Sequence, residues 1–130
     1  DPKSLDLLIT TVGAKSVHYE GREQCCGGGI LGADEQTALA LPRLKLERAV
    51  AAGADALVVV CPFCDIMYEF QQRRIEKIYD TRYRLPVLFY PQLLGLAMGL
   101  SAEEVGLRLN RVKSRKMMQI AGSGHRRTES

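Results

Sequence analysis

ADALVVVCPFCD, residues 54–65, contains the strongest signal for the fold class of this chain. Its apolar run from Ala56 to Val60 predicts a strand that is buried on both faces, as the strands of parallel sheets are. Cys61 is the last residue of this run. Pro62 suits the first turn of a helix, because no N–H is needed there. A buried strand that leads directly into a helix indicates an α/β domain.

The rest of the chain alternates between helical and extended patterns around this stretch. Helices are predicted for residues 4–12, 34–52, 62–74, 91–100 and 101–110, and strands for residues 16–19, 56–60 and 85–90. This order predicts an α/β domain with a small, mostly parallel sheet flanked by helices. Residues 1–112 are expected to form this single domain. Residues 113–130 are expected to be a basic, disordered tail.

The helix predicted for residues 34–52 contains a proline in its middle. Leu41, Leu44 and the pair Ala49-Val50 are expected to face the core. Pro42 removes one backbone hydrogen bond and clashes with the preceding turn. The helix should therefore be kinked at Pro42 or divided into two shorter helices.

The helix that begins at Pro62 is predicted to bury an apolar face. Phe63, Ile66, Met67 and Phe70 follow helical spacing, which is typical of side chains that pack into a core. Phe63 also lies between two cysteines, so it is expected to touch whatever those cysteines bind.

The four cysteines of the chain form two pairs. Cys25 and Cys26 are adjacent and are followed by three glycines, while Cys61 and Cys64 form a C-x-x-C motif. Glycines allow the backbone to approach a ligand closely. Cys61 ends a predicted strand, and ligands of open α/β sheets bind at the carboxyl ends of strands. The two pairs are therefore expected to meet in one site.

Three chemistries are compatible with these cysteines. A helix N-terminus lowers the pKa of nearby thiols, so Cys61 and Cys64 should be good ligands or nucleophiles. A four-cysteine zinc site is one alternative, although adjacent cysteines point apart and chelate a single ion poorly. Thiol–disulfide exchange is another, but it needs no second pair. An iron–sulfur cluster ranks first, because adjacent thiolates can reach different irons.

These motifs resemble the cysteine-rich CCG domain in the B subunit of heterodisulfide reductase. The resemblance is carried by CCGGG at residues 25–29, CPFC at residues 61–64 and PQLLGLAMGLSAEEVGL at residues 91–107. Over residues 1–112 the sequence is similar to the second, C-terminal CCG module of that subunit. CPFC is more typical of this family than of the related CCG proteins in glycolate or lactate oxidation.

The resemblance implies a noncubane 4Fe-4S cluster, made of two fused units and held by five cysteines. Cys25, Cys26, Cys61 and Cys64 would be four of these ligands and form the metal-binding and cofactor-binding site. The fifth should precede the Cys25-Cys26 pair by a few tens of residues, and residues 1–24 contain no cysteine. We therefore expect it to lie before Asp1, together with the first CCG module.

The function implied by the resemblance is part of an oxidoreductase that acts on sulfur. The domain would take part in the two-electron reduction of a disulfide substrate. Its implied partners are the N-terminal CCG module of the same subunit and an iron–sulfur electron-donor subunit. A non-catalytic zinc-binding or iron–sulfur electron-transfer module is the alternative, and zinc could occupy the cysteines of an isolated fragment.

Composition limits the location and the other partners. The longest apolar run is too short to span a membrane and no signal peptide precedes the domain, so a cytoplasmic protein is expected. Seven Lys or Arg and one Glu lie within residues 108–130, so the net charge of +3 is a property of that segment and does not indicate nucleic-acid binding. His18, Lys15 and Arg22 are interpreted as surface residues, and His125 as part of the tail.

Overall fold

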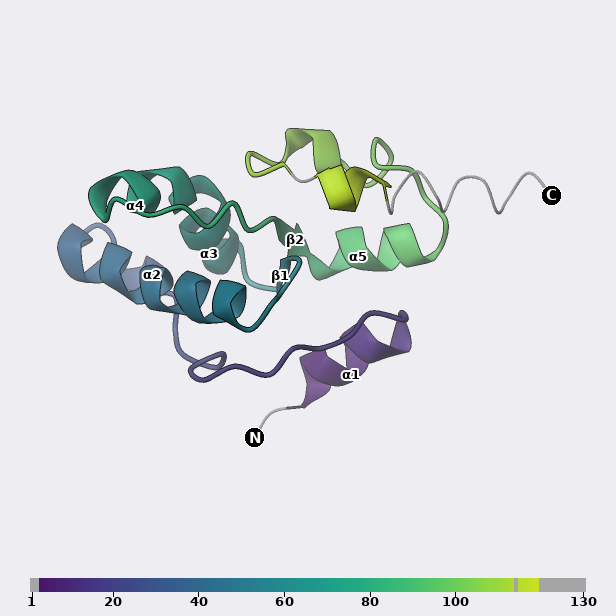
Figure 1. Ribbon diagram of the computed structural model, residues 1–130, viewed down its shortest axis with the longest axis horizontal. Helices are drawn as coiled ribbons and strands as arrows, with labels where there is room; N and C mark the ends of the chain where they lie inside the picture. The colour runs from purple at the N-terminus through teal and green to yellow at the C-terminus, as the bar shows by residue number, and fades with distance from the viewer. Residues whose placement is uncertain (1–2, 114, 120–130) are drawn as a thin grey trace.

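A computed structural model describes residues 3–113 and 115–119 of the chain (Figure 1). The elements in chain order are α1 (Ser4–Thr11), the 3-10 turn η1 (Gly28–Ile30), α2 (Glu35–Ala51), β1 (Leu57–Val59), α3 (Pro62–Asp65), the π-helix η2 (Ile66–Phe70), α4 (Gln72–Ile78), β2 (Val87–Phe89), α5 (Tyr90–Ala97) and the 3-10 turn η3 (Leu107–Leu109).

β1 and β2 form a two-stranded parallel sheet at the centre of the domain. Leu57 pairs with Val87 and Val59 with Phe89. Helices α2, α3 and α4 lie on one side of the strands and α5 on the other, with α1 below them (Figure 1). The predicted α/β class, with a small parallel sheet flanked by helices, is confirmed.

Residues 16–19, predicted to be a strand, form none. This segment is held by side chains from α1 instead of by strand pairing. The Asp6 carboxylate accepts hydrogen bonds from the Ser16 hydroxyl and from Arg22 Nη1, the latter at 3.0 Å. The Ser16 hydrogen bond is the main cause of a lowered Asp6 pKa, and the Arg22 charge adds to it.

Side-chain amides satisfy the outer edge of β2, where a third strand would otherwise bind. Asn110 Nδ2 donates to the carbonyl of Val87 at 2.7 Å, and Gln92 Oε1 accepts from the amide of Phe89 at 3.1 Å. Gln92 Nε2 also donates to Asn110 Oδ1 at 3.1 Å. Because an open edge can pair with another strand, these side chains allow the sheet to end after two strands.

Gln72 has the same role at the start of β2. Its side chain is fully buried. Nε2 donates to the carbonyls of Tyr68 and Leu85, and Oε1 accepts from the amide of Leu85, all at 2.9 Å. One side chain thus pairs both backbone groups of Leu85 and joins α4 to the strand.

α2 is one continuous helix that contains Pro42, so the second of the two predicted alternatives, a division into two helices, is ruled out. The predicted inward face is also wrong, because Leu41, Leu44 and Val50 are exposed and only Ala49 is buried. The buried residues of α2 are Ala38, Leu39, Pro42, Leu46 and Ala49. The core side of the helix therefore contains the proline ring itself.

The helix after Cys61 changes its winding at η2. The amide of Gln71 donates to the carbonyl of Ile66, five residues earlier, at 3.1 Å. An α-helix turns by about 100° per residue, and the wider π-turn brings consecutive side chains closer to one face. Met67, Tyr68 and Glu69 are all buried as a result.

The predicted apolar face of the helix is wrong. Of its four members, only Met67 is buried, whereas Phe63 is 57%, Ile66 39% and Phe70 42% exposed. Sequence periodicity assumes an uninterrupted α-helix, and the π-turn shifts the register from Ile66 onward.

Hydrogen bonds attach the C-terminal part of the described chain to the rest of the domain. Ser101 and Glu104 form the predicted capping box, but only one turn follows before Gly106 takes a left-handed conformation with φ +71°. Glu69 accepts hydrogen bonds from the amides of Arg111 and Val112. Within the segment expected to be a disordered tail, residues 115–119 are helical.

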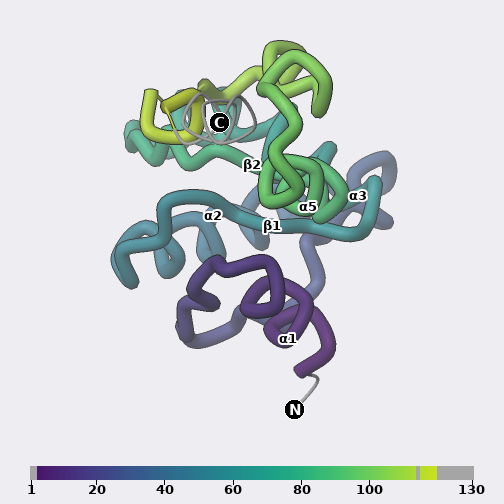
Figure 2. The backbone as a smooth tube through the Cα atoms, turned by 90° about the vertical axis from the view of Figure 1, so that its right-hand side faces the viewer, coloured from purple at the N-terminus to yellow at the C-terminus, as the bar shows by residue number. Residues whose placement is uncertain are grey.

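Two contacts hold this short helix. Lys116 Nζ pairs with Asp55 at 2.7 Å, and Met117 packs against the small cluster of Leu88 and Leu107. In Figure 2 the helix of residues 115–119 and α1 lie on opposite sides of the strands. His125 lies outside the described residues.

We expect Gln72→Leu to lower the free energy of unfolding by about 3 kcal/mol, because each buried backbone group left without a partner costs about 1–3 kcal/mol. Urea denaturation followed by circular dichroism measures this loss. Gln36→Leu, on the exposed surface of α2, is the matched control and should change stability little. Equal losses for the two variants would contradict the role assigned to Gln72.

Candidate metal centre

Cys61 is positioned by the junction of β1 and α3. It has an extended backbone, with φ −110° and ψ 130°, and caps a helix whose first residue is Pro62. Hydrogen bonds from the amides of Cys64 and Phe63 to its sulfur lower the pKa of Cys61 below its usual value. The predicted activation of this thiol by the helix N-terminus is confirmed.

Cys64 differs, and the prediction of a lowered pKa for it is wrong. Burial is the main reason, and interactions with the thiols of Cys26 and Cys61 add to it, so that the pKa of Cys64 rises to about 12. The same interactions show that these three sulfurs are neighbours. All four cysteines are free thiols. Cys26 interacts with Cys64, so the two motifs meet through these residues as the sequence predicts.

The glycine loop makes this meeting geometrically feasible. Gly27 has φ +79°, and a Cβ atom there would lie 2.9 Å from Leu41 Cδ1 and 3.1 Å from the carbonyl oxygen of Ala38. Pro42 has no N–H to offer that carbonyl. A Cβ atom on Gly28 would lie 3.0 Å from Phe63 Cβ. The loop therefore lies against both α2 and α3, closer than residues with side chains could.

The adjacent cysteines of this loop differ in exposure. Cys26 is 4% exposed and belongs to the main core cluster, while Cys25 is exposed. Among the described residues, no three Cys, His, Asp or Glu side chains form a ready site for a metal ion.

Lys45 fastens the segment before Cys25 to α2. Its ammonium group donates to the carbonyls of Arg22 and Gln24 at 2.7 and 2.6 Å. Burial lowers the pKa of Lys45, and the charges of the thiols of Cys64, Cys26 and Cys25 act against that shift. The positive charge of Lys45 therefore lies where it can stabilise thiolates.

Tyr68 is the second residue at the site that sequence reasoning missed. It is 1% exposed, and its phenol oxygen has no hydrogen-bond partner. Charge on Cys26, Cys64 and Cys25 contributes to a raised pKa of Tyr68, after burial as the main cause. The C-x-x-C spacing of the cysteines does not predict that Tyr68 or Lys45 lies at the site. Both residues reach it only because their helices pack against the cysteine segments.

The donor set fits an iron–sulfur cluster. Thiolates are the protein ligands of such clusters, and the thiolates of adjacent cysteines can reach different irons. A buried phenol without a partner and a lysine beside the thiols are groups that interact favourably with sulfur atoms carrying negative charge.

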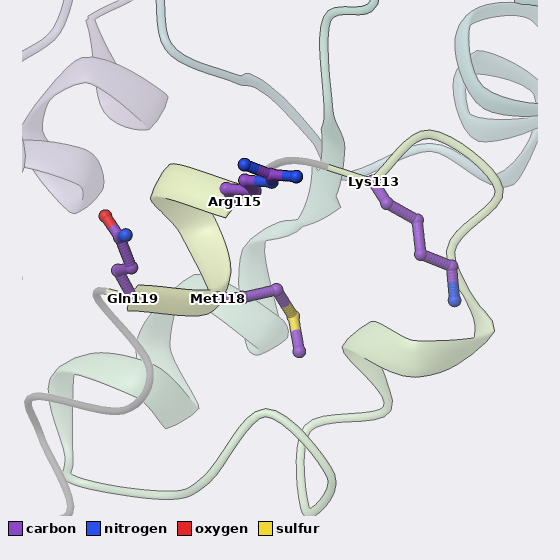
Figure 3. A pocket seen from close by; sticks show the side chains of 4 residues that line it. All are labelled: Lys113, Arg115, Met118 and Gln119. Atoms are coloured by element: carbon purple, nitrogen blue, oxygen red, sulfur yellow. The ribbon is translucent and has the colours of Figure 1, made fainter.

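Two other residues considered from the sequence are Arg22 and His18. Arg22 pairs with Asp6, and His18 is exposed. His18 borders a hollow of about 360 Å³. A second hollow of about 410 Å³ is lined by Lys113, Arg115, Met118 and Gln119 and contains no cysteine (Figure 3).

A family model for the CCG cysteine-rich domain matches residues 1–69, which include all four cysteines. This chain belongs to the CCG cysteine-rich domain family.

Relatives of this CCG domain include reductase subunits. The B subunit of the ferredoxin:CoB-CoM heterodisulfide reductase of Methanosarcina mazei is 37% identical over 115 residues, which is 87% of this chain and 38% of that subunit. The 8-methylmenaquinol:fumarate reductase membrane anchor subunit of Wolinella succinogenes is 32% identical over 117 residues, 90% of this chain and 41% of that subunit. The CCG domain thus spans about two-fifths of the length of these relatives. The predicted relationship to the B subunit of heterodisulfide reductase is confirmed.

A solved structure shares the fold of the CCG domain. The crystal structure of a hypothetical protein from Helicobacter pylori aligns with a TM-score of 0.75 at 22% identity, covering 84% of this chain and 22% of that one. In the part of the chain that the structure describes, none of the helices has the length and apolar character needed to span a membrane.

We expect Gly27→Ala to lower the free energy of unfolding of the CCG domain by about 2 kcal/mol, since a left-handed conformation costs a residue with a Cβ about 1–2 kcal/mol and the added atom also presses on Ala38. Thermal or urea unfolding measures this. Gly29→Ala is the matched control, because a Cβ atom at Gly29 meets nothing within 4 Å. Equal effects at the two positions would argue against the close approach of the loop.

We expect Cys61 of the metal-free CCG domain to alkylate more than about tenfold faster than Cys64 at neutral pH, because the thiolate is the reactive form. Limited iodoacetamide labelling followed by peptide mass spectrometry gives the ratio. Raising the pH toward the pKa of Cys64 should narrow the difference. Faster labelling of Cys64 at neutral pH would contradict the assigned pKa shifts.

Proposed function

We propose that this CCG domain holds a noncubane 4Fe-4S cluster through Cys25, Cys26, Cys61 and Cys64. We further propose that it is the C-terminal CCG module in the B subunit of a heterodisulfide reductase-like complex and takes part in reducing a disulfide substrate. The observation that carries the proposal is the convergence of Cys26, Cys61 and Cys64 from two motifs that are 34 residues apart. The reductase subunits among the relatives support it.

The protein supplies ligation and placement in this proposal. The amides at the start of α3 stabilise the Cys61 thiolate, and the glycine loop places Cys26 beside Cys64. Lys45 holds the segment before Cys25 in place and contributes a positive charge. An iron–sulfur cluster, when bound, supplies electron storage and iron sites with affinity for sulfur.

The proposed reaction cleaves the sulfur–sulfur bond of the substrate. Two electrons and two protons convert the disulfide into two thiols. The electrons would come from an iron–sulfur subunit of the same complex. The side chain of Phe63, 57% exposed beside Cys61 and Cys64, offers an apolar surface next to the site.

The proposal requires further parts beyond these 130 residues. A five-cysteine cluster needs one more thiolate, and the four cysteines of the chain are already assigned. We propose that it precedes the Cys25-Cys26 pair in the natural protein and that an N-terminal CCG module faces this one. A cytoplasmic location, where thiols stay reduced, belongs to the same proposal.

The test is the metal content of the natural full-length protein, prepared without oxygen. We expect about four iron and four sulfide for this site, with an EPR signal after oxidation that changes when thiol is added. Serine variants of each of the four cysteines should lose this signal. Val60→Ser is the matched control, because it introduces the same side chain at the exposed residue before Cys61.

Finding one zinc per site and no sulfide would contradict the proposal of an iron–sulfur cluster. It would favour the alternative of a non-catalytic zinc-binding module. Iron and sulfide with no response to thiol or disulfide would retain the cluster and favour electron transfer without disulfide reduction.

A further inference from the structure

The phenol oxygen of Tyr68 is a buried polar atom without a partner. Tyr68 is among the largest fully buried side chains of the described domain, and its hydroxyl makes no hydrogen bond. Buried polar groups are nearly always paired, because leaving one without a partner costs free energy. An orphaned hydroxyl in a well-packed core therefore points to a ligand that binds next to it.

The surroundings of Tyr68 indicate where that ligand lies. The side chain is brought inward by the π-turn of η2, directly after the C-x-x-C helix. It belongs to the same core cluster as Cys26, and Cys64 packs against that cluster. The thiols of Cys26, Cys64 and Cys25 all lie near enough for their charge to act on the phenol. The orphaned hydroxyl therefore lies within electrostatic range of three of the four proposed ligands.

The Tyr68 phenol can act as a hydrogen-bond donor at this position, and Lys45 adds a positive charge nearby. Lys45 Nζ lies 5.6 Å from the centre of the Tyr68 ring and is bonded to the carbonyls of Arg22 and Gln24. The ordinary pKa of a tyrosine is about 10, so the phenol of Tyr68 carries its proton at neutral pH. A neutral phenol can then donate to a sulfur atom that carries negative charge.

We propose that Tyr68 donates its phenolic O–H to a sulfur of the bound cluster or of its cysteine ligands, and thereby raises the reduction potential of the cluster. This inference rests on the proposed function, because it needs a cluster at Cys25, Cys26, Cys61 and Cys64. Tyr68 is a positioning and tuning residue here, and no proton leaves it.

The sign of the effect follows from charge. Reduction adds an electron and makes the sulfur atoms more negative, so a hydrogen-bond donor stabilises the reduced form more than the oxidised form. Hydrogen bonds to the sulfurs are among the factors that set the potentials of iron–sulfur centres. Removing the donor should therefore make the cluster harder to reduce.

The first test is a redox titration of Tyr68→Phe in the natural full-length protein, monitored by EPR at the signal that Cys64→Ser abolishes. We expect the reduction equilibrium to fall about tenfold, which is a shift of about 59 mV to lower potential for a one-electron couple. Tyr83→Phe is the matched control. Its hydroxyl donates to Glu47 at 3.1 Å, and no cysteine is among the groups that shift its pKa.

The second test uses stability and does not depend on activity. In the metal-free protein, Tyr68→Phe removes an unpaired buried hydroxyl, so its melting temperature should equal or exceed that of the wild type. In the cluster-loaded protein the same change removes a hydrogen bond, so the melting temperature should fall. Tyr83→Phe should change both states in the same direction.

The outcomes separate this inference from the proposed function. One outcome is that the wild type binds the cluster while Tyr68→Phe changes neither the reduction potential nor the difference in melting temperature between loaded and metal-free protein. That result would overturn the role of Tyr68 and leave the proposed cluster in place. A wild-type protein without iron and sulfide overturns the proposed function and this inference with it. A lowered potential together with opposite stability changes in the two states supports both.

Discussion

The site depends on a close contact between the glycine loop and two helices. Gly27 lies against the Ala38 carbonyl of α2, and Gly28 lies against Phe63 of α3, at distances that leave little or no room for a Cβ atom. Without this approach, Cys26 could not lie beside Cys64. Pro42 takes part in the same contact, because it leaves the Ala38 carbonyl without its usual helical donor.

A sheet of only two strands is sufficient because side chains replace the missing neighbours. Gln72 pairs with both backbone groups of Leu85, while Asn110 and Gln92 bond to Val87 and Phe89 at the outer edge of β2. These bonds hold β2 in register with β1, at whose end Cys61 lies. The position of the first C-x-x-C thiol thus depends on amide side chains from three different segments.

The surroundings of the site distinguish thiols that are alike in sequence. Cys61 receives amide hydrogen bonds at the start of a helix. Cys64 is instead partly buried and interacts with the thiols of Cys26 and Cys61. Lys45 and Tyr68 approach the same sulfurs from α2 and η2. A cationic group and a buried donor beside several thiols are suited to a centre whose negative charge changes with its redox state.

The α/β class, the pairing of the two cysteine motifs and the resemblance to the CCG family could be predicted from the residues alone. These follow from local signals: an apolar run that ends at Cys61, a helix-starting proline and fixed cysteine spacing. The inward face of α2, the burial of Tyr68 and the opposite pKa shifts of Cys61 and Cys64 depend on how the helices pack. Periodicity assumes a regular helix, so it could not anticipate a proline ring packed in the core or a π-turn at Ile66–Phe70. A pKa shift depends on burial and on neighbours distant in the chain, and those are set only when the helices pack.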